Sequence, residues 1–186
     1  MGEITSNGGL NKQQLATIDT VSRLIDEVSD EDKYLTFEIG VKTFGINIEP
    51  VKEIIEYEHL TRIPMTPGYI RGVVNLRGNV VPIIDLAKRL DLDGRELSKR
   101  TCLIILQLAT EDETMDIGIL VDSVSEVLDL PADEIEPAPS FGVEVRSDFI
   151  DGMGKIQGKF VTILDVDKVL SIQELAQFTE QMSHAG

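Results

Sequence analysis

Two aspartates hold equivalent places in two similar stretches of the sequence and could form an acid/base pair. The stretches cover residues 68–90 and 148–170, with Asp85 in the context IIDL and Asp165 in ILDV. Two carboxylates, one from each copy, could share a proton as aspartic dyads do. A short helix is also expected after each aspartate, and an aspartate at that position caps a helix. Capping is the interpretation we favour, and the dyad is the enzymatic alternative.

Three side chains further upstream have the spacing of metal ligands on a helix. Glu53, Glu56 and His59 lie three residues apart, which would place them on one helical face. The sequence IIEY at 54–57 favours a strand instead. We therefore predict a solvated acidic surface and no metal site.

Nucleophilic and nucleotide chemistry find little support. A histidine-dependent triad would have to use His59 or His184, and the chain has no G-x-S-x-G motif. Residues 152–159 resemble a phosphate-binding loop, but Met153 and Phe160 stand where that motif needs glycine and serine or threonine. We predict no catalytic residue and no cofactor.

Composition excludes further classes. The chain has 186 residues, of which 42% are hydrophobic, and a formal net charge of −16. An acidic surface repels phosphate backbones and anionic lipids, so nucleic acid is not an expected partner. Cys102, the single cysteine, lies in the apolar run CLIILQL and is expected to be buried. We see neither an export signal nor a membrane-spanning stretch, and we expect a cytoplasmic protein without direct membrane insertion.

A two-residue hydrophobic period predicts β-structure for most of the chain. Residues 34–48 read as a hairpin, and residues 49–53 as a short helical turn that begins at a proline. A second hairpin lies within residues 68–90, with Gly78 in its turn. Pro82 has no N–H to donate, which predicts an edge position for its strand.

The sequence repeats these elements. At an offset of 80 residues the two copies share Ile70/Ile150, Gly72/Gly152, Gly78/Gly158, Val81/Val161, Ile83/Ile163, Asp85/Asp165, Lys88/Lys168 and Leu90/Leu170. Upstream, Gly-Ile at 45 and VKEI at 51 match Gly-Ile at 118 and VSEV at 124, at an offset of 73. Short strands joined by Gly and Pro turns tend to close into barrels. We predict a mainly β protein whose five-stranded unit occurs twice, over roughly 34–97 and 98–168, with a seam between the barrels.

The two ends of the chain differ from this domain, which we place at residues 34–182. Residues 1–33 are predicted to be a flexible extension that carries one amphipathic helix, because Leu15, Ile18, Val21, Ile25 and Val28 have helical spacing. Such a stripe fits the protein's own body and a partner groove equally well. A C-terminal helix is expected over 166–182, and a disordered tail over 183–186.

Several separated motifs together resemble the CheW family of bacterial chemotaxis coupling proteins. They are IRGVVNLRGNVVPIIDL, preceded by FGINIEPVKEII and LTRIPMTPGY, and followed by IGILVDSVSEVLDL, PAPSF and ILDVDKVL. The resemblance implies two intertwined SH3-like β-barrels of five strands each and no enzymatic activity. It also implies an adaptor that couples the cytoplasmic tips of methyl-accepting chemotaxis receptors to the regulatory domain of the histidine kinase CheA, within signalling arrays.

The resemblance further implies which residues meet the partners. The receptor's helical hairpin is expected in an apolar groove between the barrels, with contacts from Val51, Glu53, Gly72, Arg77 and Gly78. The kinase is expected at Phe141, which follows PAPS, and near Glu136, a position that is often basic in relatives. A double-barrel interaction module unrelated to chemotaxis is the remaining alternative.

Overall fold

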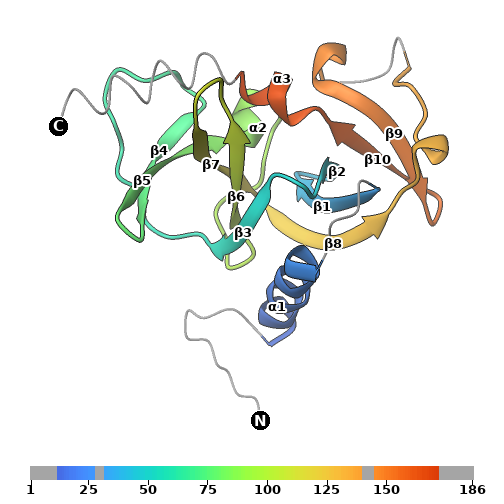
Figure 1. Cartoon of the computed structure of the whole chain (residues 1–186), viewed down its shortest axis with the longest axis horizontal. Coiled ribbons are helices and arrows are strands. Elements are labelled where there is room, and N and C mark those ends of the chain that lie inside the picture. Colours follow the sequence, from blue (N-terminus) through green and yellow to red (C-terminus); the bar gives the residue numbers. More distant parts are fainter. Residues whose placement is uncertain (1–11, 28–31, 140–144, 172–186) are drawn as a thin grey trace.

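The computed structural model describes residues 12–27, 32–139 and 145–171, and β-strands are its main secondary structure (Figure 1). The helices are α1 (Lys12–Glu27), α2 (Leu86–Arg89) and α3 (Val166–Leu170), with 3-10 turns η1 (Ala132–Glu134) and η2 (Ser147–Phe149). The strands are β1 (Lys33–Ile39), β2 (Lys42–Asn47), β3 (Val51–Glu56), β4 (Ile70–Leu76), β5 (Asn79–Asp85), β6 (Cys102–Ala109), β7 (Thr114–Val121), β8 (Ser123–Asp129), β9 (Ile150–Ile156) and β10 (Lys159–Leu164). The predicted mainly β fold is confirmed.

The ten strands form two five-stranded sheets that exchange strands between the two sequence repeats. Sheet A has the order β8-β1-β2-β10-β9, and sheet B has the order β3-β6-β7-β5-β4. Each sheet therefore takes its hairpin β1-β2 or β6-β7 from one repeat and its other three strands from the other. The predicted division at residues 34–97 and 98–168 follows the sequence repeats, whereas each sheet combines strands from both sides of it, so the barrels are intertwined.

Two equivalent parallel strand pairings connect the exchanged hairpins to the sheets that they join. β2 lies parallel to β10, with Gly45 opposite Ile163, and β7 lies parallel to β5, with Gly118 opposite Ile83. A Cβ atom at Gly45 would lie 3.0 Å from the Ile163 Cδ1 atom, and one at Gly118 only 2.3 Å from the Ile83 Cδ1 atom. Each glycine thus leaves room for an isoleucine of the other repeat.

The largest apolar cluster lies between the sheets and joins them. It combines Leu35 and Phe37 of sheet A with Ile104 and Leu106 of sheet B, all at most 1% exposed. Neighbouring side chains such as Leu103 alternate to the other face of sheet B and line a smaller core of that barrel. Sheet A has its own small core around Val161. The two barrels consequently share the largest of their buried apolar clusters.

The expected hairpins and caps are present, and two local predictions are wrong. Arg77 and Gly78 both have positive φ, 53° and 87°, as a two-residue type I′ hairpin turn requires. The segment at 49–53 is not a helical turn, because β3 begins at Val51 and pairs with β6. Pro82 lies in β5, which is an interior strand. Its missing N–H is tolerated because the pairing of β5 with β7 starts one residue later, at Ile83.

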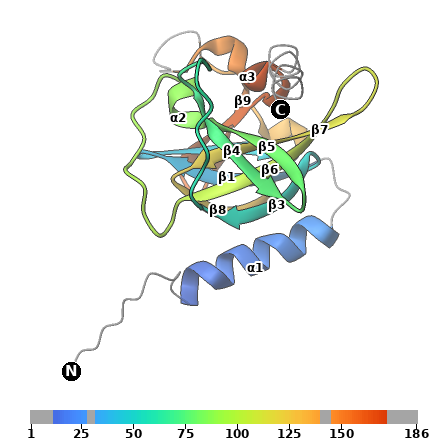
Figure 2. The same ribbon diagram turned by 90° about the vertical axis from the view of Figure 1, so that its left-hand side faces the viewer.

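The helices predicted near the two ends of the chain differ in how far the structure matches them. α1 forms over Lys12–Glu27 and lies along β3 and β8 (Figures 1 and 2). α3 ends at Leu170, and Ser171 takes a left-handed conformation with φ 49°, so the helix expected over 166–182 does not run on from α3. The remainder of that prediction and the predicted tail at 183–186 lie outside the described residues. Within those residues, no helix combines the length and the apolar character needed to cross a bilayer.

Arg89 joins the two repeats at the end of the molecule where α2 meets α3. Its Nε–H donates to the Val169 carbonyl at 2.6 Å. Its guanidinium lies 4.8 Å from the ring centre of Tyr69 and 5.2 Å from that of Phe149, which are equivalent residues of the two copies. One arginine therefore makes a charged hydrogen bond and two cation–π contacts across the pseudo-symmetric junction.

Replacement of Arg89 by alanine should loosen this junction. We expect Arg89→Ala to lower the free energy of unfolding by about 2 kcal/mol, from one charge-assisted hydrogen bond and two cation–π contacts. Urea denaturation followed by circular dichroism measures the change. Lys88→Ala, on the exposed neighbouring side chain, is the control. Equal stability of the two variants would contradict the role given to Arg89.

Candidate functional site

An exposed ion pair joins the tip of one hairpin to β3. The Arg77 Nη1 and Nη2 groups donate to the two Glu53 carboxylate oxygens at 3.0 and 2.8 Å. The Arg77 side chain is 73% exposed and that of Glu53 is 23% exposed. These hydrogen bonds raise the pKa of the guanidinium above its ordinary value. Of the five N–H donors of an arginine side chain, two point to Glu53, so others stay available to an acceptor on a partner.

The pair connects opposite ends of sheet B. β3 is the first strand of that sheet and β4 the last, and Arg77 sits in the turn that joins β4 to β5. In sheet A the equivalent positions carry Gln157 and Glu126, so this charge pair can exist in one barrel only. The repeat therefore separates what the fold requires, a turn with two positive φ angles, from what is peculiar to the first copy, an arginine.

The two glycines predicted at the receptor contact have different roles. Gly72 is buried with φ 150°, and a Cβ atom there would lie 2.6 Å from the Thr61 carbonyl oxygen. This close approach lets Thr61 pair with Val73 on the open side of β4. Gly78 is exposed in the turn, and a Cβ atom there would meet nothing within 4 Å. Gly78 thus lies on an accessible surface, whereas Gly72 supports the fold.

Val51 lies in β3 but is only 5% exposed. It shares the large buried cluster with Ile54 of the same strand. Val124 and Val127 of β8, their equivalents at the offset of 73, are partly buried and pack against that cluster. The four side chains define what we call the β3–β8 seam. Val124 and Val127 were missed as site candidates, although the repeat of VKEI by VSEV pointed to them.

The apolar groove expected between the barrels is not open. The shared cluster fills the middle of the interface, and α1 covers the β3–β8 seam. Toward α2 and α3 a small apolar pocket remains, lined by Ile46, Leu86, Leu106, Ile119, Leu164, Val166, Val169 and Leu170. The seam is thus a surface that already holds a helix.

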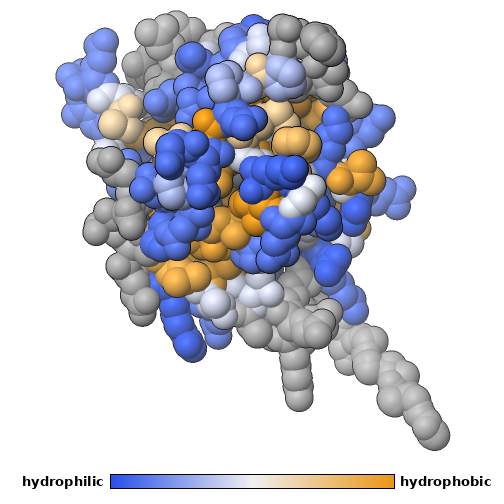
Figure 3. Space-filling model, turned by 90° about the vertical axis from the view of Figure 1, so that its right-hand side faces the viewer, coloured by the Kyte–Doolittle hydropathy of each residue, from blue (hydrophilic) through white to orange (hydrophobic). Residues whose placement is uncertain are grey.

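Of the two residues predicted to meet the kinase, Glu136 is described by the structure and lies beside the other barrel. Glu136 is exposed, and its backbone pairs with Met153 of β9 through hydrogen bonds of 2.8 and 2.7 Å. Phe141 lies outside the described residues. The face on the β9 and β10 side is mostly hydrophilic, with apolar side chains between the charged ones (Figure 3). Glu136 therefore lies on sheet A, whereas Glu53 and Arg77 lie on sheet B.

The candidates for chemistry have structural tasks instead. Asp85 and Asp165 each accept a hydrogen bond from the backbone N–H three residues on, at 3.2 Å, which confirms the capping interpretation. Asp85 also takes a hydrogen bond of 3.1 Å from Arg71. Among the described residues, no group of three His, Cys, Asp or Glu side chains is placed to hold a metal ion. Burial raises the pKa of the Cys102 thiol to about 11, so it stays protonated near neutral pH.

Comparison with known proteins identifies the family of this chain. The CheW-like domain family matches residues 33–174. The chain belongs to the CheW-like family. It is 38% identical to the chemotaxis protein CheW of Klebsiella aerogenes, over 87% of this chain and 95% of that protein. It is 36% identical to the chemotaxis protein CheW of Bacillus subtilis, over 77% of this chain and 90% of that protein.

A solved structure agrees with the fold. The scaffolding protein TtCheW from Thermoanaerobacter tengcongensis matches with a TM-score of 0.66 and 31% identity, over 75% of this chain and 87% of that one. The resemblance seen in the sequence motifs is thereby confirmed. Family membership makes this chain a non-catalytic chemotaxis protein of the CheW type, so the carboxylate-dyad enzyme is set aside.

The cap at Asp165 can be separated from any carboxylate chemistry by two substitutions. Asp165→Ala should lower the free energy of unfolding by about 1 kcal/mol, because the Lys168 N–H loses its acceptor. Asp165→Asn should change it by only a few tenths of a kcal/mol, since an asparagine oxygen caps about as well. Thermal denaturation compares the two. A loss as large for Asn as for Ala would show that the negative charge matters rather than the cap.

Proposed function

We propose that this protein is a cytoplasmic adaptor that couples the tips of chemoreceptors to the histidine kinase CheA and supports assembly of their signalling array. The observation that carries the proposal is the Arg77–Glu53 pair, an exposed charge pair peculiar to one barrel, on the strand that forms half of the β3–β8 seam. Membership in the CheW-like family and a relative described as a scaffolding protein support it.

We assign receptor binding to sheet B and call this contact the receptor arm. A receptor tip is a helical hairpin, and an amphipathic helix binds by laying its apolar face on an apolar strip. Val51 supplies apolar contact on β3, while the remaining N–H groups of Arg77 meet a receptor carboxylate beside it. Gly78 allows the turn to approach the partner's backbone, and Gly72 keeps the hairpin packed beneath it. Glu53 orients the guanidinium.

We assign kinase binding to the barrel of sheet A, at Glu136 and at Phe141 further along the chain, and call this contact the kinase arm. Contacts on separate barrels allow receptor and kinase to bind the same molecule at once. Each contact needs only modest strength, with a dissociation constant of about micromolar order, because many copies act together in an array. A change in the receptor passes to the kinase if the two bound states differ in contact free energy. The net charge of −16 agrees with protein partners rather than nucleic acid.

Arg77 should be required for receptor-dependent kinase control. Arg77→Glu sets two like charges against each other and removes the donors, so we expect stimulation of CheA autophosphorylation in receptor-containing membranes to fall about tenfold or more. Gln157→Glu places the same exposed glutamate at the equivalent turn of sheet A and should retain stimulation. Unchanged circular dichroism spectra establish that both variants fold. No stimulation by the wild-type protein would contradict the proposed function itself.

The kinase arm should be separable from the receptor arm. Phe141→Ala should weaken binding to the isolated CheA regulatory domain by about tenfold, as loss of an aromatic anchor does, while binding to receptor membranes is retained. Arg77→Glu should show the opposite pattern. Isothermal titration calorimetry with each partner separately measures both. If the two variants lose the same partner, the assignment of one partner to each barrel is wrong.

A further inference from the structure

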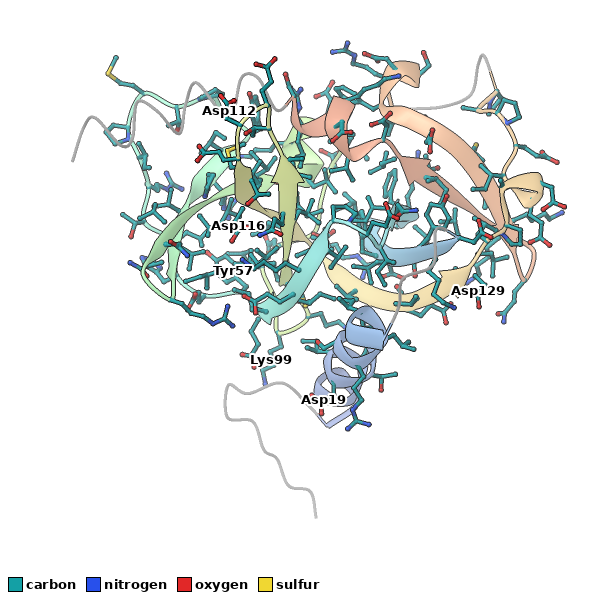
Figure 4. All side chains as sticks on the ribbon, viewed as in Figure 1. Asp19, Tyr57, Lys99, Asp112, Asp116 and Asp129 are labelled. Carbon is teal, nitrogen blue, oxygen red and sulfur yellow. The ribbon has the colours of Figure 1, made fainter. Side chains whose placement is uncertain are left out.

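The β3–β8 seam is occupied by a segment of the same chain. α1 lies along both strands (Figures 1 and 2), and Val21, at its middle, is only 2% exposed. Ile18 and Ile25 flank it at helical spacing and pack against the same cluster that holds Val51 and Ile54. Asp19 lies on the side of α1 turned away from the sheets (Figure 4). The seam therefore holds a helix through one narrow apolar stripe.

The sequence equivalence of the two strands explains why a helix fits there. Val51 and Ile54 of β3 correspond to Val124 and Val127 of β8, so two similar apolar edges belong to the two sheets. A helix laid along both covers them together. Both are terminal strands of their sheets, and an uncovered terminal strand invites pairing with other chains.

We infer that α1 is a displaceable occupant of this seam, and that the receptor's amphipathic helix binds there only when α1 leaves. The inference rests on the proposed function, which makes Val51 a receptor contact. A side chain that is 5% exposed cannot contact a second protein while its cover stays in place. α1 thereby sets the apparent affinity for receptors, because only the fraction of molecules with an open seam binds.

α1 is suited to leaving. It belongs to neither β-ladder, so its departure breaks no strand pairing. A helix of 16 residues is only marginally stable by itself in water, so an undocked α1 loses most of its helical structure. Docking of α1 is thus coupled to its helix propensity. A substitution at an exposed position of α1 should change the receptor affinity without touching the seam.

Thr20 allows this test, because it is exposed in the middle of α1. Thr20→Gly should bind a purified soluble fragment of a chemoreceptor cytoplasmic domain more tightly than Thr20→Ala, by about fivefold, the ratio that the difference in helix propensity between glycine and alanine allows. The same Ala and Gly pair at exposed Lys88 in α2 controls for general destabilisation and should show equal affinities. Calorimetric titration measures all four variants.

Hydrogen exchange gives a second readout on the wild-type protein. Receptor fragment should speed amide exchange in residues 12–27 and slow it in β3. Equal affinities of the Thr20 variants, tighter binding by Thr20→Ala, or added protection of α1 on binding would overturn the inference, because α1 would then be a fixed cover or part of the receptor site. Failure of every variant to bind the receptor fragment would instead contradict the proposed function, and the inference with it.

Discussion

The structure depends on the apolar cluster shared by the two sheets. Because the hairpins β1-β2 and β6-β7 cross into the barrel of the other repeat, side chains such as Phe37 and Ile104 become fully buried between the sheets. Neither barrel could keep this surface from water alone. Exchange of the hairpins also makes the two sheets inseparable, so the relative position of their surfaces is set by packing rather than by a linker. Under the proposed function, this packing holds the two partners at a defined spacing.

Strand exchange leaves four terminal strands, and each is covered locally. The open side of β4 pairs with Thr61, and that of β9 pairs with Glu136, the equivalent place in the other copy. α1 covers β3 and β8 together. The first two covers are backbone hydrogen bonds close in sequence to the strands they protect. The third is a helix that packs through side chains and belongs to neither β-ladder, and it is the cover that we propose is exchanged for a partner.

The candidate site lies where the repeats differ. Both hairpin turns place two residues at positive φ, so the backbone need is the same in each copy. Only the first copy adds an arginine, and only there does a glutamate from β3 meet it. Arg89 is a second such difference, since Val169 stands at the equivalent position and accepts its hydrogen bond. The duplicated fold thus supplies two similar backbones, and single side chains give one of them an exposed charge pair and a hydrogen bond to the other copy.

The sequence alone determined the local features. Strand periodicity, turn glycines and capping aspartates act between residues close in the chain, so the hairpins, the caps at Asp85 and Asp165 and the duplication were predictable, as was the family from its motifs. The partners of β1 and β2, the interior position of Pro82 and the burial of Val51 were not. Those depend on which distant strands meet, and short strands of similar composition can pair within a repeat or between repeats. Only the packed structure decides between these pairings, because the gain comes from the core they create together, and only that packing places α1 over the seam.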